Sequence, residues 1–157
     1  MISTSASAIP AGKSPYLLLF RDVSTETYKT LSPEQRQQLF TEWYAWYDRL
    51  AAQGKLIHGH PLEESGRVVS ARNGRVMDGP FIEAKEVVGG YFFLAVDNEA
   101  EAVEIAKQCP TLAHDLGLTV EVRPVAGLCP VLSATPAGEE RSKQLQAAVA
   151  VSAPAVS

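Results

Sequence analysis

The chain has 157 residues, of which 46% are hydrophobic and 20% are charged, and its formal net charge is -4. This length and composition suit one globular domain with tails and exclude a largely disordered chain. The acidic balance, without a concentrated basic face, argues against nucleic acid or an anionic membrane as a direct partner. No apolar run approaches the roughly 20 residues that span a bilayer, and the first residues do not resemble a secretory signal. We therefore expect a cytoplasmic protein.

The two cysteines do not suggest a metal site. Cys109 and Cys129 lack both the Cys-x-x-Cys spacing and the neighbouring histidines of a zinc site. We expect free thiols, no metal and no cofactor.

The first half of the chain predicts a strand and a helix. Residues 16–21 form a short continuous apolar run, which is typical of a central strand. A helix should follow, because Ser32 can cap its first turn, Pro33 suits its first position and Gln35 completes a capping box. Gly54 suits the left-handed residue that ends such a helix. The apolar positions of this helix form an aromatic face that must be buried: Leu39, Trp43, Tyr44, Trp46, Tyr47 and Leu50.

A second strand and a hairpin are predicted next. Residues 55–61 suit a strand that ends at a proline. Two short runs, residues 67–71 and 75–77, flank Asn73-Gly74, a strong hairpin signal because both turn residues tolerate a positive φ. We interpret this hairpin as an insertion into the fold.

The remaining elements repeat the strand and helix pattern. Residues 91–96 suit a third strand, and Asn98 with Glu101 can cap a second helix that Pro110 stops. The alternation of polar and apolar residues over 119–125 predicts a last strand.

This order predicts an α+β fold, namely a ferredoxin-like βαββαβ sandwich with an inserted β-hairpin and both helices on one face of the sheet. The other face would expose more apolar surface than monomers normally show. Two sheets packed face to face, pairing as a dimeric α+β barrel, would bury it, with a residue such as Leu18 in the interface. We divide the chain into a flexible N-terminal segment (1–14), a domain (15–126) and a C-terminal tail, part of which suits a helix (127–157).

One motif gives a family resemblance. It consists of Asp78, Gly79, Pro80, Phe81, Glu83, Lys85, Glu86, Gly89 and Gly90, together with residues 120–125. With these residues the chain resembles, over residues 16–125, the YCII-related proteins in their DGPF-motif branch. The resemblance implies the dimeric α+β barrel and, because DGPF-type proteins often accompany alternative sigma factors, a link to such a factor.

The resemblance also shows where this chain departs from its relatives. The YCII proteins proper are thought to carry a His-Asp pair, the histidine in the first helix and the aspartate just after the second. This sequence has Trp43 at the histidine position and Cys109 at the aspartate position. Neither residue moves protons as imidazole and carboxylate do, so the chemistry of that branch does not transfer.

Asp78 supports two interpretations. Its carboxylate can accept backbone amides and hold a tight turn before Gly79-Pro80. Alternatively, it is exposed at the mouth of the barrel, with Glu83 and Glu86 nearby as a second acid or base. A solvated charged turn would show the same pattern.

His58 and His60 lie two residues apart on a predicted strand and therefore share a face. With Asp78 or Glu83 they would suit a metal site or a proton shuttle, although no third ligand is positioned by the sequence. The other interpretations are a pocket histidine at position 60 and a surface pair.

We expect His60, Asp78 and Glu83 to converge at one rim of the sheet, because the insertion leaves from the second strand and returns to the third. Trp43 and Tyr47, which also suit the core, would supply an apolar wall. The predicted ligand-binding residues are His60, Asp78, Phe81, Glu83, Lys85, Glu86, Trp43 and Tyr47.

Two functions remain open at this point. The absent His-Asp pair and the extra tail favour a small-molecule-binding or regulatory module linked to an alternative sigma factor. The alternative is a cofactor-independent enzyme of the isomerase, lyase or monooxygenase type, in which Asp78, Glu83 and His60 transfer protons. The expected partners are a second copy of the chain through the sheet faces, a small molecule and a sigma-factor-associated protein.

Overall fold

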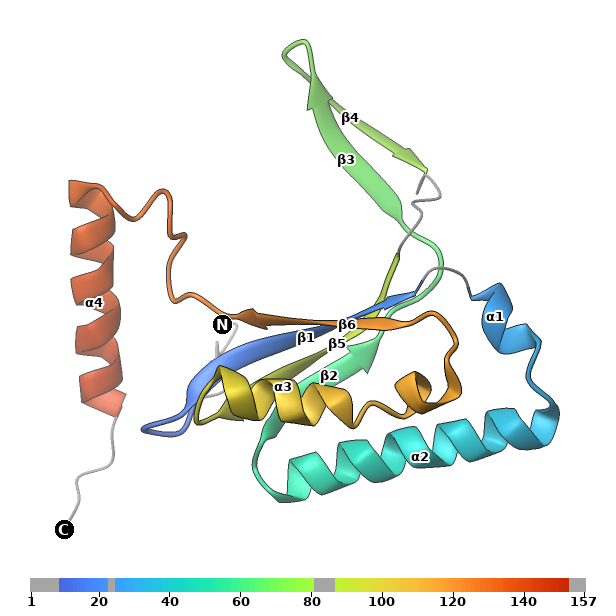
Figure 1. Ribbon diagram of the computed structural model, residues 1–157. Helices are drawn as coiled ribbons and strands as arrows, with labels where there is room; N and C mark the ends of the chain where they lie inside the picture. The colour runs from blue at the N-terminus through green and yellow to red at the C-terminus, as the bar shows by residue number, and fades with distance from the viewer. Residues whose placement is uncertain (1–8, 23–24, 81–86, 153–157) are drawn as a thin grey trace. The chain divides into compact units, whose positions relative to one another are not determined.

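The computed structural model describes residues 9–22, 25–80 and 87–152 (Figure 1). The chain divides into two compact units, Met1–Pro124 and Val125–Ser157. Among the described residues, no helix is long and apolar enough to cross a membrane. The first unit contains β1 (Ser14–Asp22), α1 (Glu26–Lys29), α2 (Pro33–Ala52), β2 (Leu56–Pro61), β3 (Arg67–Arg72), β4 (Arg75–Pro80), β5 (Val87–Val96), α3 (Glu99–Lys107), the 3-10 helix η1 (Pro110–His114) and β6 (Thr119–Pro124), and the second contains α4 (Pro136–Ser152).

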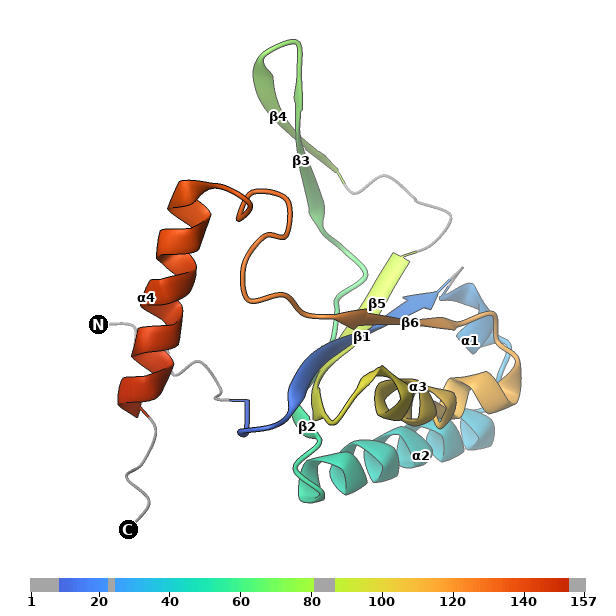
Figure 2. The same cartoon turned by 60° about the vertical axis from the view of Figure 1, so that its left-hand side comes forward.

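The main sheet has four antiparallel strands in the order β2-β5-β1-β6. Helix α2 connects β1 to β2, and α3 connects β5 to β6. Both helices lie on the same face of the sheet, as Figures 1 and 2 show from two directions. This arrangement confirms the predicted α+β, ferredoxin-like βαββαβ architecture.

Side chains alternate between the two faces of the sheet. On β1, Leu18 and Phe20 are buried beneath the helices, whereas Leu17 and Leu19 face the other way and are half-buried. The expectation that Leu18 lies on the helix-free face is therefore wrong by one residue. The core between sheet and helices is completed by residues such as Trp46, Leu50, Leu94, Val96 and Ile105.

The predicted ends of α2 are confirmed by their hydrogen bonds. The Ser32 hydroxyl accepts a bond from the Gln35 amide at 3.1 Å, and the Gln35 side chain accepts one from the Ser32 amide at 2.8 Å. Gly54, just after the helix, has a φ of 71°. These contacts satisfy backbone groups that the helix itself leaves unpaired.

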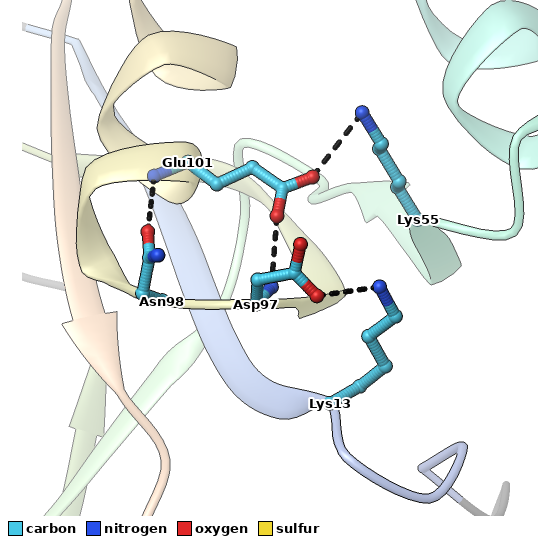
Figure 3. A network of polar contacts seen from close by, with 5 residues as sticks. All are labelled: Lys13, Lys55, Asp97, Asn98 and Glu101. Atoms are coloured by element: carbon cyan, nitrogen blue, oxygen red, sulfur yellow. Dashed lines mark hydrogen bonds and ion pairs between the residues drawn. The ribbon is translucent and has the colours of Figure 1, made fainter.

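The start of α3 belongs to a polar network that joins three segments (Figure 3). The Asn98 side chain accepts a bond from the Glu101 amide, while the Glu101 carboxylate accepts the Asp97 amide at 2.8 Å and pairs with Lys55 at 3.2 Å. Lys13 pairs with Asp97 at 2.6 Å, and this hydrogen bond raises the pKa of Lys13 and lowers that of Asp97. Both groups are exposed, so the network mainly orients the chain.

Strands β3 and β4 form a separate two-stranded sheet. Asn73 and Gly74 connect them with φ angles of 51° and 74°, as the hairpin motif predicts. The tight turn expected at Asp78 is wrong: Asp78 and Gly79 pair with Val69 and Val68 in the last part of β4. The ladder itself provides backbone partners there.

The structure describes part of each end of the chain. Residues 1–8 of the predicted flexible segment lie outside the described residues, and Ser14 already belongs to β1. In the second unit, the Thr135 hydroxyl accepts a hydrogen bond from the Gly138 amide at 3.2 Å and so caps α4.

We predict that Leu19→Asp prevents formation of the homodimer. Leu17 and Leu19 on β1, with Tyr91 and Phe93 on β5, are half-buried on the helix-free face, and an aspartate there would bring a charge into the proposed interface. Light scattering should give twice the chain mass of 16.9 kDa for the wild type and a single mass for the variant. Leu112→Asp, on η1, should remain dimeric. A wild-type protein that is monomeric at micromolar concentration would contradict the face-to-face barrel.

Candidate functional site

A cavity of about 610 Å³ lies between α2 and one rim of the sheet. Its size falls within the range of about 300–1,000 Å³ that small-molecule sites occupy. The rim is formed by the end of β1, the end of β2 and the beginning of β5. The cavity is lined by Phe20, Asp22, Tyr28, Arg36, Leu39, Phe40, Trp43, Tyr44, Tyr47, Gly59, His60, Pro61, Gly89, Gly90, Phe92 and Leu118.

Aromatic rings form a large part of the cavity wall. Phe20 of β1 and Phe92 of β5 are buried and meet edge to face, with ring centroids 5.0 Å apart. From α2, Trp43 lies 4.9 Å from Phe20 and Tyr47 lies 5.7 Å from Phe92, both also edge to face. Such rings hold one another in fixed orientations and leave an apolar surface for a ligand.

Asp22 places a carboxylate at this apolar wall. It continues the helix-facing row Leu18, Phe20, Asp22 along β1, because alternate residues of a strand share a face. The pairing of β1 with β5 is irregular here, and Gly89 is the extra residue of a bulge. A Cβ atom on Gly89 would lie 2.6 Å from Oδ2 of Asp22, so the glycine provides the space that the carboxylate occupies.

Tyr28 of α1 holds this carboxylate in place. Its hydroxyl donates a hydrogen bond to Oδ1 of Asp22 at 2.9 Å, and among the described residues it is the only donor to Asp22. Burial raises the pKa of Asp22, and the bond from Tyr28 opposes that rise. Burial, together with the charge and the hydrogen bond of Asp22, also raises the pKa of Tyr28, so its hydroxyl stays protonated and remains a donor.

The polar contacts continue from Tyr28 into α2. Thr111 of η1 is fully buried and accepts a hydrogen bond at 2.9 Å from the indole Nε1 of Trp43. The Thr111 hydroxyl also interacts with that of Tyr28, which lowers the pKa of Tyr28 by a smaller amount. Trp43, Thr111, Tyr28 and Asp22 thus form one series that crosses the structure from α2 to β1. A buried polar series of this kind fixes the geometry of its members.

The family model of the YCII-related domain matches residues 15–126 of the chain. The chain belongs to the YCII-related family. The matched region includes the cavity and the hairpin but not α4. No curated protein matches the chain.

Trp43 and Cys109, the residues expected in place of a His-Asp pair, are not arranged for proton transfer. Trp43 donates its indole hydrogen to Thr111, two residues beyond Cys109. Cys109 is buried, and burial raises its pKa to about 11, so its thiol is neutral near pH 7. A neutral thiol and an indole provide no base for proton transfer.

The structure places three of the predicted residues at the cavity, namely Trp43, Tyr47 and His60. His60 pairs with Tyr91 across the sheet, and the two rings are 6.2 Å apart. Because its neighbour Gly59 pairs with the helix-facing Phe92, the His60 imidazole lies toward the other face, and its backbone borders the cavity.

The other predicted residues do not line the cavity within the described part of the chain. Asp78 accepts a hydrogen bond from Arg67 at 2.7 Å, and both side chains are exposed. Phe81, Glu83, Lys85 and Glu86 lie outside the described residues. The convergence of His60, Asp78 and Glu83 therefore stays a prediction. The described residues contain no cluster of three or more histidine, cysteine or acidic side chains that would hold a metal ion.

Sequence reasoning missed Asp22, Tyr28 and Thr111. The position of Asp22 was available as a signal, because it lies two residues after Phe20 and so extends the apolar face of the strand with a carboxylate. Tyr28 and Thr111 lie in a four-residue helix and a 3-10 turn. Neither element has a hydrophobic period that would indicate which side chain points inward.

We predict that Tyr28→Phe destabilises the protein by about 1 kcal/mol, because it removes a partly buried hydrogen bond to a charged group. The pKa of Asp22 should rise further, since that bond favours the carboxylate form. Chemical denaturation measures the first effect, and an NMR titration of the Asp22 carboxyl carbon measures the second. Tyr16→Phe is the matched control, because no hydrogen bond of the Tyr16 hydroxyl is found among the described residues. An unchanged Asp22 pKa would contradict the proposed role of Tyr28.

We predict that Asp22→Asn stabilises the protein most at neutral pH. The pKa of Asp22 is raised in the folded state, so stability is lost as pH rises through that pKa and is fully present below the ordinary value of 3.8. Asparagine does not titrate and can still accept the bond from Tyr28. The difference in unfolding free energy between variant and wild type should therefore shrink in acid. Asp48→Asn, an exposed change on α2, should show no such trend. A difference that is independent of pH would rule out the burial effect at Asp22.

Proposed function

We propose that this YCII-related protein binds a small, predominantly aromatic molecule in the cavity between α2 and the sheet. The observation that carries the proposal is the cavity of about 610 Å³ itself, walled by Phe20, Trp43, Tyr47 and Phe92. An apolar, concave surface with a few polar groups at one end is the usual form of a small-molecule site.

Two exposed aromatic residues extend this surface at the mouth of the cavity. Phe40 and Tyr44 are 64% and 50% exposed, and their ring centroids are 4.6 Å apart. Arg36 lies one turn before Phe40 on the same side of α2 and also lines the cavity. Single exposed apolar residues are common, but a pair continuous with a cavity favours a ligand entrance.

The proposal includes membership of the DGPF branch and a regulatory role linked to an alternative sigma factor. Support for this part comes from the motif that begins at Asp78 and from the associations that the resemblance implies. The purified protein should then bind an alternative sigma factor from the same source in an analytical sedimentation experiment. Independent sedimentation of the two proteins, with and without small-molecule extracts of the source, would remove the regulatory part and leave the cavity proposal intact.

The second candidate is a cofactor-independent enzyme of the isomerase, lyase or monooxygenase type. One observation favours it: Asp22 is a half-buried carboxylate with a raised pKa in an aromatic cavity, as expected for a group that transfers protons. In this version Asp22 replaces Asp78 as the principal acid or base. Asp22→Asn separates the candidates, because an enzyme would lose turnover of its substrate whereas a binding module has no turnover to lose.

The cavity can be tested through its two tryptophans. Trp43 lines the cavity and Trp46 does not, so the ¹H–¹⁵N spectrum contains a reporter and an internal reference. We expect 2-phenylethanol at millimolar concentration to shift the indole signal of Trp43 more than that of Trp46, with Trp43→Phe used for assignment. Tyr44→Ala should weaken binding severalfold, whereas Leu112→Ala, a change on η1 outside the cavity, should not. The absence of any Trp43 shift would contradict the proposal.

A further inference from the structure

We propose that the cavity selects ligands that carry an amine, with the protonated nitrogen at Asp22 and the apolar body against the rings of α2. This inference rests on the proposed function of the same cavity and names the chemical class of its ligand. Three observations carry it, namely the acceptor capacity of Asp22, the position of its carboxylate and the aromatic wall.

The Asp22 carboxylate has more acceptor capacity than the protein uses. An ionised carboxylate offers about four acceptor positions on two oxygens. Among the described residues, only the Tyr28 hydroxyl donates to it, and this bond reaches Oδ1. Oδ2 lies against Gly89, in the space that a side chain there would need, and no donor to Oδ2 is found among the described residues. A ligand that donates a hydrogen bond would therefore complete the coordination of a half-buried charge.

The position of the carboxylate favours a ligand inside the cavity over one in bulk solvent. Asp22 follows the buried Phe20 on the helix-facing row of β1, and both residues line the cavity. The series of polar contacts through Tyr28 and Thr111 holds the carboxylate in one orientation. Because this orientation is set before a ligand arrives, binding needs little rearrangement of Asp22.

The charge of Asp22 distinguishes a cationic donor from a neutral one. An ammonium group and an alcohol can both donate a hydrogen bond to the carboxylate, but only the ammonium group also gains the attraction between opposite charges. Trp43, Tyr44 and Tyr47 line the cavity and would contact the apolar body of either ligand. The charge therefore favours a protonated amine over an alcohol of the same shape.

Among the described residues that line the cavity, Arg36 is the cationic side chain, and its charge opposes this selection. Its guanidinium is exposed on the first part of α2, so solvent and salt screen its repulsion of a bound cation. Asp22, in contrast, is half-buried, and its interactions are screened less. The net effect of the two groups favours a cation at the Asp22 end and a polar or anionic group, where the ligand has one, at the Arg36 end.

Three probes of similar shape and different charge test the inference: phenethylamine, 2-phenylethanol and 3-phenylpropionate. Titration near pH 7, monitored by the indole signal of Trp43, should show the amine binding about tenfold more tightly than the alcohol. The carboxylate should bind more weakly than the amine. Asp22→Asn should reduce the affinity for the amine to that for the alcohol, while Asp48→Asn leaves the preference unchanged.

Tyr28→Phe provides a second variant that keeps the carboxylate and should keep the preference for the amine. Equal affinities for amine and alcohol in the wild type would overturn the inference and leave the aromatic cavity established. A preference for the amine that survives Asp22→Asn would also overturn it. If none of the three probes shifts the Trp43 signal, the proposed function fails, and the inference fails with it.

Discussion

Both the sheet and the cavity depend on the packing of the Phe92 ring against its neighbours. It projects from the centre of β5 and lies 5.0 Å from Phe20 and 4.9 Å from Trp46, measured between ring centroids. A Cβ atom on Gly59 would lie 2.5 Å from Cδ1 of Phe92, so β2 can pair with β5 at this register only because position 59 is a glycine. With the ring fixed, the aromatic residues of α2 pack around it, and the cavity lies on the side of Trp43 and Tyr47.

The two tryptophans of α2 show that this packing is more than an apolar core. Trp46 is 1% exposed, and within the described part of the chain its Nε1 has no hydrogen-bond partner, a defect that costs about 1–3 kcal/mol. Trp43 is less buried, yet its Nε1 donates to Thr111. Of the two indoles, the one that lines the cavity is therefore the one with a polar partner. Thr111 accepts its hydrogen bond and also connects it to Tyr28 and Asp22.

The series of polar contacts from Trp43 through Thr111 fixes the position of Tyr28. Helix α1 has four residues, no side-chain cap and no fully buried residue, so little within the helix itself holds it. The contacts of Tyr28 with Asp22 and Thr111 link α1 to β1 and η1. Asp22 is thus oriented by Tyr28, six residues along the chain, and through it by Thr111 of the distant η1, which is a typical arrangement for a preorganised site.

The sequence predicted the elements whose signals are local. The capping box of Ser32, the left-handed Gly54 and the Asn73-Gly74 turn depend on neighbouring residues, and the structure confirms each of them. From the order of these elements, the sequence also predicted the βαββαβ sheet and the placement of both helices on one of its faces. The site was harder to predict because tertiary packing brings Asp22 to the cavity and Thr111 to the indole of Trp43.

At the motif around Asp78, a local signal gave a wrong prediction. Its residue types suggested a turn and a site, but β4 continues through Asp78, and the carboxylate pairs with Arg67 of the neighbouring strand. A Gly-Pro pair at the end of an edge strand carries the same local signal as a turn. Only the cross-strand partner distinguishes the two.

The diglycine of the family signature connects the fold to the site. The predicted third strand begins at residue 91, yet Gly89 and Gly90 both lie within β5, and each makes room for a different neighbour. A Cβ on Gly90 would lie 3.0 Å from the His60 carbonyl oxygen, so this glycine allows β2 to approach. Gly89 makes room for Asp22 instead. A larger residue at position 89 would displace the carboxylate while leaving the aromatic wall in place, so Gly89 and Asp22 form one structural unit within the signature.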